Sequence, residues 1–269
     1  LFTTTPGVGS FYFPKSKNKN KTKKTRYVYL FHSLVSPNQV YIKNSFSKFD
    51  VILSPNKIIT EQLIFITSKK AKIYTVGYPA LNHYTDGTNA SNAGRVLIAP
   101  SWGEDSFLFD YEFMESLTRV ILNKDSKITI RPHPMHIERL KNDEKLKMLN
   151  VDFDFNKNLN NLNDFELLIT DWSGIALEYY YLSNGKIIFV DGVKKIRRKL
   201  TSKENSIELI EDKIRKIMGV ILKRNESIQN IYTNNVLITK NCEEYINSLY
   251  TPKFNFEDVS KIIKNFIKV

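Results

Sequence analysis

The segment Leu167–Leu182, which begins LLITDWSGIALE, constrains the fold more than any other part of the chain. Leu167–Ile169 predicts a short buried strand, Thr170–Gly174 a polar bend, and Ile175–Leu182 a helix. Backbone N–H groups at such a helix start have no partner within the helix and lie at the positive end of its dipole, so they can bind an anion. The alternative is an ordinary capped turn in which Ser173 only satisfies the first turn of the helix.

Three other strands predicted in this part of the chain also end in polar, turn-forming residues. Val96–Ala99 leads into Ser101–Gly103, Lys127–Ile130 leads into Arg131-Pro-His133-Pro, and Lys186–Val190 stops at Asp191-Gly192. Parallel strands point their carboxyl ends to the same edge of a sheet, which is where open α/β sheets bind ligands. The four strand ends are therefore expected to converge on one site.

The side chains at these strand ends suit a ligand that contains phosphate. Arg131 offers a planar fork to phosphate oxygens, His133 a second donor, and the start of the helix at Ser173 and Gly174 a backbone anion site. Glu178 either accepts ribose hydroxyls or is an ordinary surface glutamate. Because Arg131 and Ser173 lie at strand ends, alanine at either position is expected to weaken nucleotide binding with the fold intact. The predicted donor-binding residues are Ser101, Trp102, Gly103, Arg131, Thr170, Asp171, Ser173, Gly174 and Glu178.

The N-terminal part alternates strands and helices in the same way. Tyr27–Phe31, Asp50–Ser54 and Ala71–Val76 predict strands and Lys57–Ile66 a helix, which favours a parallel sheet with crossover helices. Three strands make a small sheet, so this domain is expected to be incomplete at its N-terminus. His32 follows the first strand, where ligands bind in α/β proteins. It is either a functional residue or a structural, hydrogen-bonded histidine.

Several stretches outside these strands set the domain limits. Residues 82–95 carry polar residues and glycine without an apolar period, which is typical of a linker. We therefore predict an N-terminal domain over 1–84, a second domain over 93–250, and a terminal amphipathic helix within 251–269 that packs on a domain rather than on a membrane. Residues 15–24 form a lysine run that is either a solvated loop or attracts an acidic polymer or an anionic leaflet. Three further helices are predicted at His136–Met148, Ile207–Val220 and Glu243–Leu249.

Composition narrows the partners and the compartment. The 269 residues are 42% hydrophobic, enough for globular cores, and the net charge of +12 suggests anionic partners. The single Cys242 excludes an internal disulfide framework and a multi-cysteine metal site, so a reducing compartment is expected. No apolar run reaches the roughly 20 residues that a membrane span needs, which favours a soluble or peripheral protein. The chain begins at Leu1 rather than methionine, so an N-terminal portion is expected to be missing.

The sequence also lacks the signatures of several common enzyme classes. It contains no Walker-type glycine loop and no Gly-x-Gly-x-x-Gly, which weighs against kinases and dehydrogenases. It has neither His-Glu-x-x-His nor paired cysteines, and no Gly-x-Ser-x-Gly, so zinc sites and α/β hydrolases have little support.

The motifs resemble those of the CDP-glycerol glycerophosphotransferase family, which makes teichoic-acid-like and capsular polymers. The resemblance covers roughly Tyr27 to Val190 and rests on five motifs in order. These are Phe31–Ser36, Gly77–Pro79, Ala99–Gly103, Arg131–Pro134 and Thr170–Gly174 with Glu178. It implies a GT-B fold of two Rossmann-like domains with the active site in the cleft between them. It also implies an enzyme without metal or other cofactor, cytoplasmic and peripheral at the inner face of the cell membrane.

Carried over by position, the resemblance assigns roles to three residues. His32 matches the histidine taken as the general base, His133 the histidine that assists the donor pyrophosphate, and Ser173 the serine at the phosphates. Well-known members have His-Gly where this chain has His32-Ser33, and two serines where it has Ser173-Gly174. These departures concern the donor more than the fold.

Three functions are compatible with the sequence. The first is transfer of a polyol phosphate from a CDP-activated donor to a hydroxyl of a surface polymer, with possible contact to an anionic membrane and no nucleic-acid partner. The second is a GT-B glycosyltransferase that uses a nucleotide sugar. The third is a non-catalytic module that binds anionic glycopolymer through its basic surface. Residues that point at one site favour an enzyme, and a basic stripe remote from that site would favour the binder.

Overall fold

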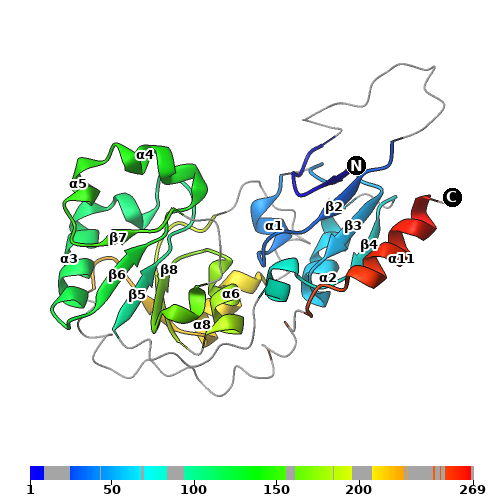
Figure 1. Ribbon diagram of the computed structural model, residues 1–269. Helices are drawn as coiled ribbons and strands as arrows, with labels where there is room; N and C mark the ends of the chain where they lie inside the picture. The colour runs from blue at the N-terminus through cyan, green and yellow to red at the C-terminus, as the bar shows by residue number, and fades with distance from the viewer. Residues whose placement is uncertain are drawn as a thin grey trace. The chain divides into compact units, whose positions relative to one another are not determined.

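The structure is a computed structural model that describes residues 1–8, 25–42, 44–67, 70–83, 94–155, 161–183, 185–195, 208–226 and 252–267, with 229, 245 and 249 as single residues. The chain forms two compact units. The first comprises Leu1–His83, Ile196–Leu209 and Glu243–Val269, and the second Tyr84–Lys195 and Ile210–Cys242. Figure 1 shows a parallel sheet in each of them.

The sheet of the first unit contains four strands in chain order, β1 (Phe2–Thr3), β2 (Val28–Leu30), β3 (Val51–Ser54) and β4 (Lys72–Thr75). Every pairing is parallel, as predicted for the last three strands. β1 has two residues, too few to show a hydrophobic period, and this is why the sequence did not predict it. The helices are α1 (Pro37–Val40) and α2 (Lys57–Ile66), and the 3₁₀ helix η1 covers Pro79–His83.

The first sheet is covered on one face by α11 (Phe256–Ile267), the predicted terminal helix. Val259, Ile262 and Phe266 pack on a buried cluster that includes Val28 and Leu53 of the sheet. The helix therefore packs on the first unit, and the expectation that it packs rather than lies on a membrane agrees with this contact (Figure 1).

A cluster of five buried aromatic side chains lies beneath the end of β2. Its members are Tyr29, Phe31, Tyr41, Phe46 and Phe49. The hydroxyls of Tyr29 and Tyr41 are 3.0 Å apart, and the rings of Tyr29 and Phe46 meet edge to face at 5.0 Å. Burial raises the pKa of the Tyr29 hydroxyl far above its ordinary value, with a further contribution from Tyr41. This aromatic cluster packs against β2 and so fixes the position of the strand that leads to His32.

The Gly77-Tyr-Pro turn joins the end of β4 to the segment before α11. Gly77 has a φ of +90°, and a Cβ atom there would lie 2.4 Å from the carbonyl oxygen of Lys253. The N–H of Tyr78 donates to the carbonyl of Pro252 at 2.9 Å. Only glycine permits this conformation together with so close an approach of the two backbones.

The second unit has six parallel strands in the order β10-β9-β8-β5-β6-β7. They are β5 (Arg95–Ile98), β6 (Lys127–Ile130), β7 (Asp152–Phe153), β8 (Leu167–Thr170), β9 (Lys186–Val190) and β10 (Val220–Leu222). The chain moves from β5 outward through β6 to β7, and then from β8 outward through β9 to β10. This is the order of a doubly wound nucleotide-binding fold. The predicted α/β class with two Rossmann-like parallel sheets is confirmed at the level of each unit.

Helices cover both faces of the second sheet (Figure 1). α3 (Tyr111–Leu122), α4 (Ile137–Lys141) and α5 (Glu144–Lys147) contribute to a core with Val96, Ile98 and Ile130 of the sheet. α6 (Ile175–Leu182) and α8 (Ile210–Ile217) lie on the other side of the strands. Three short 3₁₀ helices complete the unit, η2 (Phe107–Phe109), η3 (Pro134–His136) and η4 (Leu162–Asp164).

Two predicted helices of the second unit differ from the structure. The predicted helix His136–Met148 is divided into η3, α4 and α5, because Asp143 caps a new helix by accepting from the N–H of Leu146 at 3.1 Å. The predicted helix Ile207–Val220 ends at Ile217, and the chain continues as β10 after Gly219. The lysine run and most of the linker and of Glu243–Leu249 lie outside the described residues.

Candidate functional site

The carboxyl ends of β6, β5, β8 and β9 lie side by side, because these four strands are neighbours in one parallel sheet. The predicted convergence of four polar strand ends is therefore realised. β5 and β8 form the point where the direction of winding reverses, and a doubly wound sheet opens a ligand crevice there.

A polar clasp spans this reversal between β5 and β8. The carboxylate of Asp171 accepts from the backbone N–H and from the hydroxyl of Ser101, both at 2.8 Å. The hydroxyl of Thr170 donates to the carbonyl of Ala99 at 2.7 Å. The three side chains are buried, and their bonds join the two strand ends. In this structure the side chains of the predicted donor-binding residues Ser101, Thr170 and Asp171 form hydrogen bonds within the protein, and these bonds connect the ends of β5 and β8.

The start of α6 follows the clasp directly. Gly174 is its N-cap residue and has no side chain that could cap the helix. The Ser173 hydroxyl lies 3.4 Å from the N–H of Ile175, at the long end of hydrogen-bond distances. This helix start can therefore accept an anion. Glu178, which the sequence left open as a surface glutamate, is buried within the first turn.

Arg131 is buried and held mainly by an acidic partner. Its Nε and Nη2 atoms donate to one carboxylate oxygen of Asp154 at 3.1 and 2.7 Å, and Nη2 also donates to Asn161 at 2.5 Å. Among the described residues, Nη1 has no hydrogen-bond partner. The planar fork predicted for phosphate is thus largely committed to Asp154, and the two N–H bonds of Nη1 remain to donate.

Two histidines follow β6, and the sequence singled out only the first. His133 is half-buried, and its Nδ1 accepts from the N–H of Met135 at 3.3 Å. His136 is buried, and its Nε2 accepts from the N–H of Gly103 at 3.1 Å, which joins the loops after β5 and β6. Because Nε2 accepts, Nδ1 carries the proton, and within the described part of the chain this proton has no acceptor.

The surroundings of His136 keep its imidazole neutral at pH 7. Burial is the main cause of its lowered pKa, and the positive charges of Arg139 and Lys195 lower it further. The hydrogen bond from Gly103 and the charge of Asp171 act in the opposite direction without outweighing burial.

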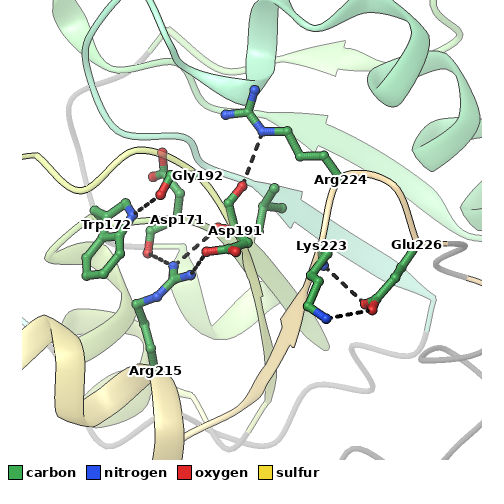
Figure 2. A network of polar contacts seen from close by, with 9 residues as sticks. Asp171, Trp172, Asp191, Gly192, Arg215, Lys223, Arg224 and Glu226 are labelled. Carbon is green, nitrogen blue, oxygen red and sulfur yellow. Dashed lines mark hydrogen bonds and ion pairs between the residues drawn. The ribbon is translucent and has the colours of Figure 1, made fainter.

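Arg215 of α8 links the ends of β8 and β9 (Figure 2). Its Nη1 donates to the carbonyl oxygens of Asp171 at 3.1 Å and Val190 at 3.2 Å, and its Nη2 lies 3.3 Å from a carboxylate oxygen of Asp191. The guanidinium also stacks 4.3 Å from the centre of the Trp172 ring, and the indole N–H donates to the carbonyl of Gly192 at 3.2 Å. The sequence did not reveal this role, because Arg215 lies on a helix with several charged residues, and no local pattern distinguishes the buried ones from the exposed ones.

His32 belongs to the first unit and lies two residues beyond β2. Its carbonyl oxygen accepts from the Tyr78 hydroxyl at 3.1 Å, so the Gly77-Tyr-Pro turn fixes the backbone at the histidine. The imidazole keeps solvent access, yet the protein around it lowers its pKa by desolvation. A neutral imidazole at pH 7 is able to accept a proton.

Residues 20–204 match the sequence model of one protein family, described as CDP-Glycerol:Poly(glycerophosphate) glycerophosphotransferase. The chain belongs to this family. The matched region contains every predicted site residue together with His136 and Lys195, whereas Arg215 lies beyond it. A search of curated protein sequences finds no significant match.

Solved structures with similar folds include a polymerase, a transferase and a putative epimerase. The wall teichoic acid polymerase TagF is 19% identical, with a TM-score of 0.43, over 63% of this chain and 51% of that chain. The chain thus spans about half the length of that polymerase. The pneumococcal O-GlcNAc transferase GtfA in complex with UDP and GlcNAc is 14% identical, with a TM-score of 0.43, over 90% of this chain and 52% of that chain. A putative UDP-N-acetylglucosamine 2-epimerase from Listeria monocytogenes is 13% identical, with a TM-score of 0.46, over 77% and 59%.

Membrane spans and metal sites each require particular features of a chain such as this member of the glycerophosphotransferase family. No helix in its described part combines the length and apolar character that crossing a bilayer requires. Within the same residues, no three His, Cys, Asp or Glu side chains gather in a way that could hold a metal ion.

Proposed function

We propose that this chain transfers a polyol phosphate, such as glycerol phosphate, from a CDP-activated donor to a hydroxyl of a cell-surface polymer. The observation that carries the proposal is the start of α6, where the N-cap residue Gly174 offers no side-chain cap. This helix start lies at the winding reversal of a nucleotide-binding sheet beside the Ser101–Asp171 clasp. A helix start in this place is suited to the pyrophosphate of a nucleotide. The choice of a polyol phosphate as the transferred group and of a polymer as the acceptor rests on the description of the family.

The proposed reaction is a displacement at the β-phosphorus of the donor. The acceptor oxygen forms a bond to this phosphorus, the bond to the bridging oxygen breaks, and CMP leaves with the electron pair. His32 accepts the proton of the acceptor hydroxyl, which its lowered pKa supports because the imidazole is neutral at pH 7. In this proposal Arg131, His133 and the helix start at Ser173 and Gly174 stabilise the charge that grows on the leaving CMP.

The proposal assigns the donor to the second unit and the general base to the first, which is the division of roles between the two domains of a GT-B enzyme. It also places the enzyme at the cytoplasmic face of the membrane, where the net charge of +12 would favour an anionic leaflet and an anionic polymer.

Ligand binding tests the identity of the donor. CDP-glycerol, CDP-ribitol, CMP, UDP-sugars and GDP-sugars would each be titrated while the melting temperature is recorded. Stabilisation by the cytidine compounds supports the proposal, because a ligand that binds only the folded state raises its stability. Stabilisation by UDP-sugars alone would replace the proposal with a glycosyltransferase. Binding of anionic polymer without any nucleotide would replace it with a non-catalytic binder.

Turnover tests the division of roles between the units. His32→Ala is expected to lose about 10²–10⁴-fold in rate and to keep the nucleotide affinity of the parent, because a general base contributes about that factor. Ser173→Ala is expected to weaken nucleotide binding. The matched control is Ser260→Ala, an exposed serine on α11, which should change neither. If His32→Ala lost donor affinity as Ser173→Ala does, His32 would belong to the donor site and the assignment would be wrong.

A further inference from the structure

Lys195 is a largely buried lysine that has no acidic partner among the described residues. It follows β9 within the sequence Val193-Lys-Lys, and only 8% of its surface is exposed. Its neighbour Lys194 pairs with the carboxylate of Asp212. In the part of the chain that the structure describes, Lys195 has no such ion pair and donates no hydrogen bond. A lysine with a buried stem holds its ammonium in one place, and an ammonium held there without a counter-charge is suited to an anionic ligand.

The loop after β5 holds this ammonium in place. Its Nζ lies 5.7 Å from the centre of the Trp102 ring. Gly103 has a φ of +113°, and a Cβ atom there would lie 2.8 Å from Nζ. Gly103 therefore leaves the space that the ammonium occupies. Because β8 lies between β9 and β5 in the sheet, the Lys195 side chain reaches across the end of β8, where α6 begins.

Several polar atoms at this edge of the sheet are buried without a partner in the described chain and are able to donate. His136 bonds to the same Gly103 and carries a buried Nδ1 proton without an acceptor in the described chain. The Nη1 of Arg131 and the hydroxyl of Ser106 are likewise buried with no partner among the described residues. Both oxygens of Asp171 already accept from Ser101, so this carboxylate is held within the clasp. The unused donors, together with the Lys195 ammonium, suit an anionic ligand.

We infer that Lys195 is a phosphate-binding residue, and that its ammonium pairs with a phosphate oxygen of the nucleotide bound at the ends of β5 and β8. The inference rests on the proposed function and adds to it a residue that neither the sequence motifs nor the family resemblance singled out. The nucleotide phosphate is a better match than a polymer phosphate, because the ammonium lies at the winding reversal of the sheet, where nucleotides bind.

Calorimetry on a small set of variants tests the inference. The dissociation constants of CMP, CDP and the uncharged nucleoside cytidine would be measured for the parent, Lys195→Met, Lys195→Gln and Lys195→Arg. The two neutral variants are expected to bind CMP and CDP about 10- to 100-fold more weakly and cytidine as the parent does, since only the phosphates are affected. Lys195→Arg keeps the charge and should regain part of the affinity. Lys194→Met, which removes one charge from the same loop, should bind within about twofold of the parent, because Asp212 already neutralises that lysine.

Melting curves of each variant show that it is folded, and the second neutral variant covers the case in which methionine disturbs the packing. Unchanged binding of CMP and CDP to either folded neutral variant would overturn the inference. A loss of poly(glycerol phosphate) binding with unchanged nucleotide binding would assign the ammonium to the acceptor and overturn it too. If the parent preferred UMP and UDP, the CDP-donor proposal would be wrong. The role of Lys195 would then be tested by measuring the dissociation constants of UMP, UDP and uridine for the same variants.

Discussion

At the scale of single residues, Arg131 shows how a strand-end position can be misread. From the sequence, its place after β6 suggests a side chain that can be removed with the fold intact. In the structure its side chain and that of Asp154 are only 8% and 11% exposed and form an ion pair at 2.7 Å. Removing one partner of a buried pair leaves the other charge uncompensated, which costs far more than the loss of a surface pair.

We therefore expect Arg131→Met to lower the free energy of unfolding by about 3–5 kcal/mol in urea titrations. The matched control is Arg119→Met, which removes an ion pair to Glu115 at 3.0 Å whose side chains are 65% and 67% exposed. This control should cost about 0.5 kcal/mol or less. The double variant Arg131→Met with Asp154→Leu should recover much of the loss, because no charge is then left unpaired. Equal stability of the two single variants would show that the Arg131–Asp154 pair contributes little.

The buried His136 is expected to make the stability of the protein depend on pH. Its pKa in the folded protein is lowered, chiefly by burial, below the ordinary value of 6.5. The unfolded chain therefore takes up a proton at a higher pH than the folded chain does. Its contribution to stability is present above pH 6.5 and is lost as the pH falls from 6.5 through the lower, folded-state pKa.

The replacement His136→Gln keeps an acceptor for the N–H of Gly103 and removes the titrating group. Melting temperatures recorded from about pH 8 to about pH 5 should fall less steeply for this variant than for the parent. His32, whose pKa is also lowered, is present in both proteins and so does not affect the difference. If the melting temperatures of the parent and of His136→Gln fell equally with pH, the protonation of His136 would not contribute to the pH dependence of stability.

At the scale of elements, the docking of α11 can be tested on one helix face. Ile262 packs on the first sheet, whereas Ser260 is exposed on the same helix. Ile262→Asp should destabilise the docking by at least about 1 kcal/mol, because it places a charge against an apolar cluster. Hydrogen exchange should then rise in α11 and β3 but not in β5 or β8. Ser260→Asp should exchange as the parent does, and the same exchange in both variants would contradict the docking.

The elements also show what a sequence can and cannot reveal. Long apolar runs such as Lys186–Val190 and strong helical periods such as Phe256–Ile267 match the structure residue for residue. β1 and β7 have two residues each and carry no period to detect. The polar strand ends were found because parallel topology follows from alternating strands and helices. Side-chain partners such as Asp154 for Arg131 depend on packing between distant segments, so no local pattern discloses them.

At the scale of the whole molecule, each unit has its own sheet and its own hydrophobic core. Unfolding is therefore expected to depart from a single two-state transition in scanning calorimetry. CMP at a hundredfold excess over its dissociation constant should stabilise the transition of the second unit by about 2.7 kcal/mol. Ile262→Asp should lower the other transition. If calorimetry showed a single transition, and if CMP and Ile262→Asp each shifted that same transition, the two units would unfold as one.

The return of the chain to the first unit sets the order in which the two units can be completed during translation. The strands β1 to β4 leave the ribosome first, but α11 and Lys253, which meets the Gly77 turn, are made only after the second unit. At common synthesis rates the interval between Val76 and Phe256 is on the order of 10 to 40 s. Throughout that time the apolar face of the first sheet has no helix to cover it in the nascent chain. A pause in synthesis before Pro252 would prolong this exposure, and the nascent first unit is therefore where this protein would most depend on chaperones.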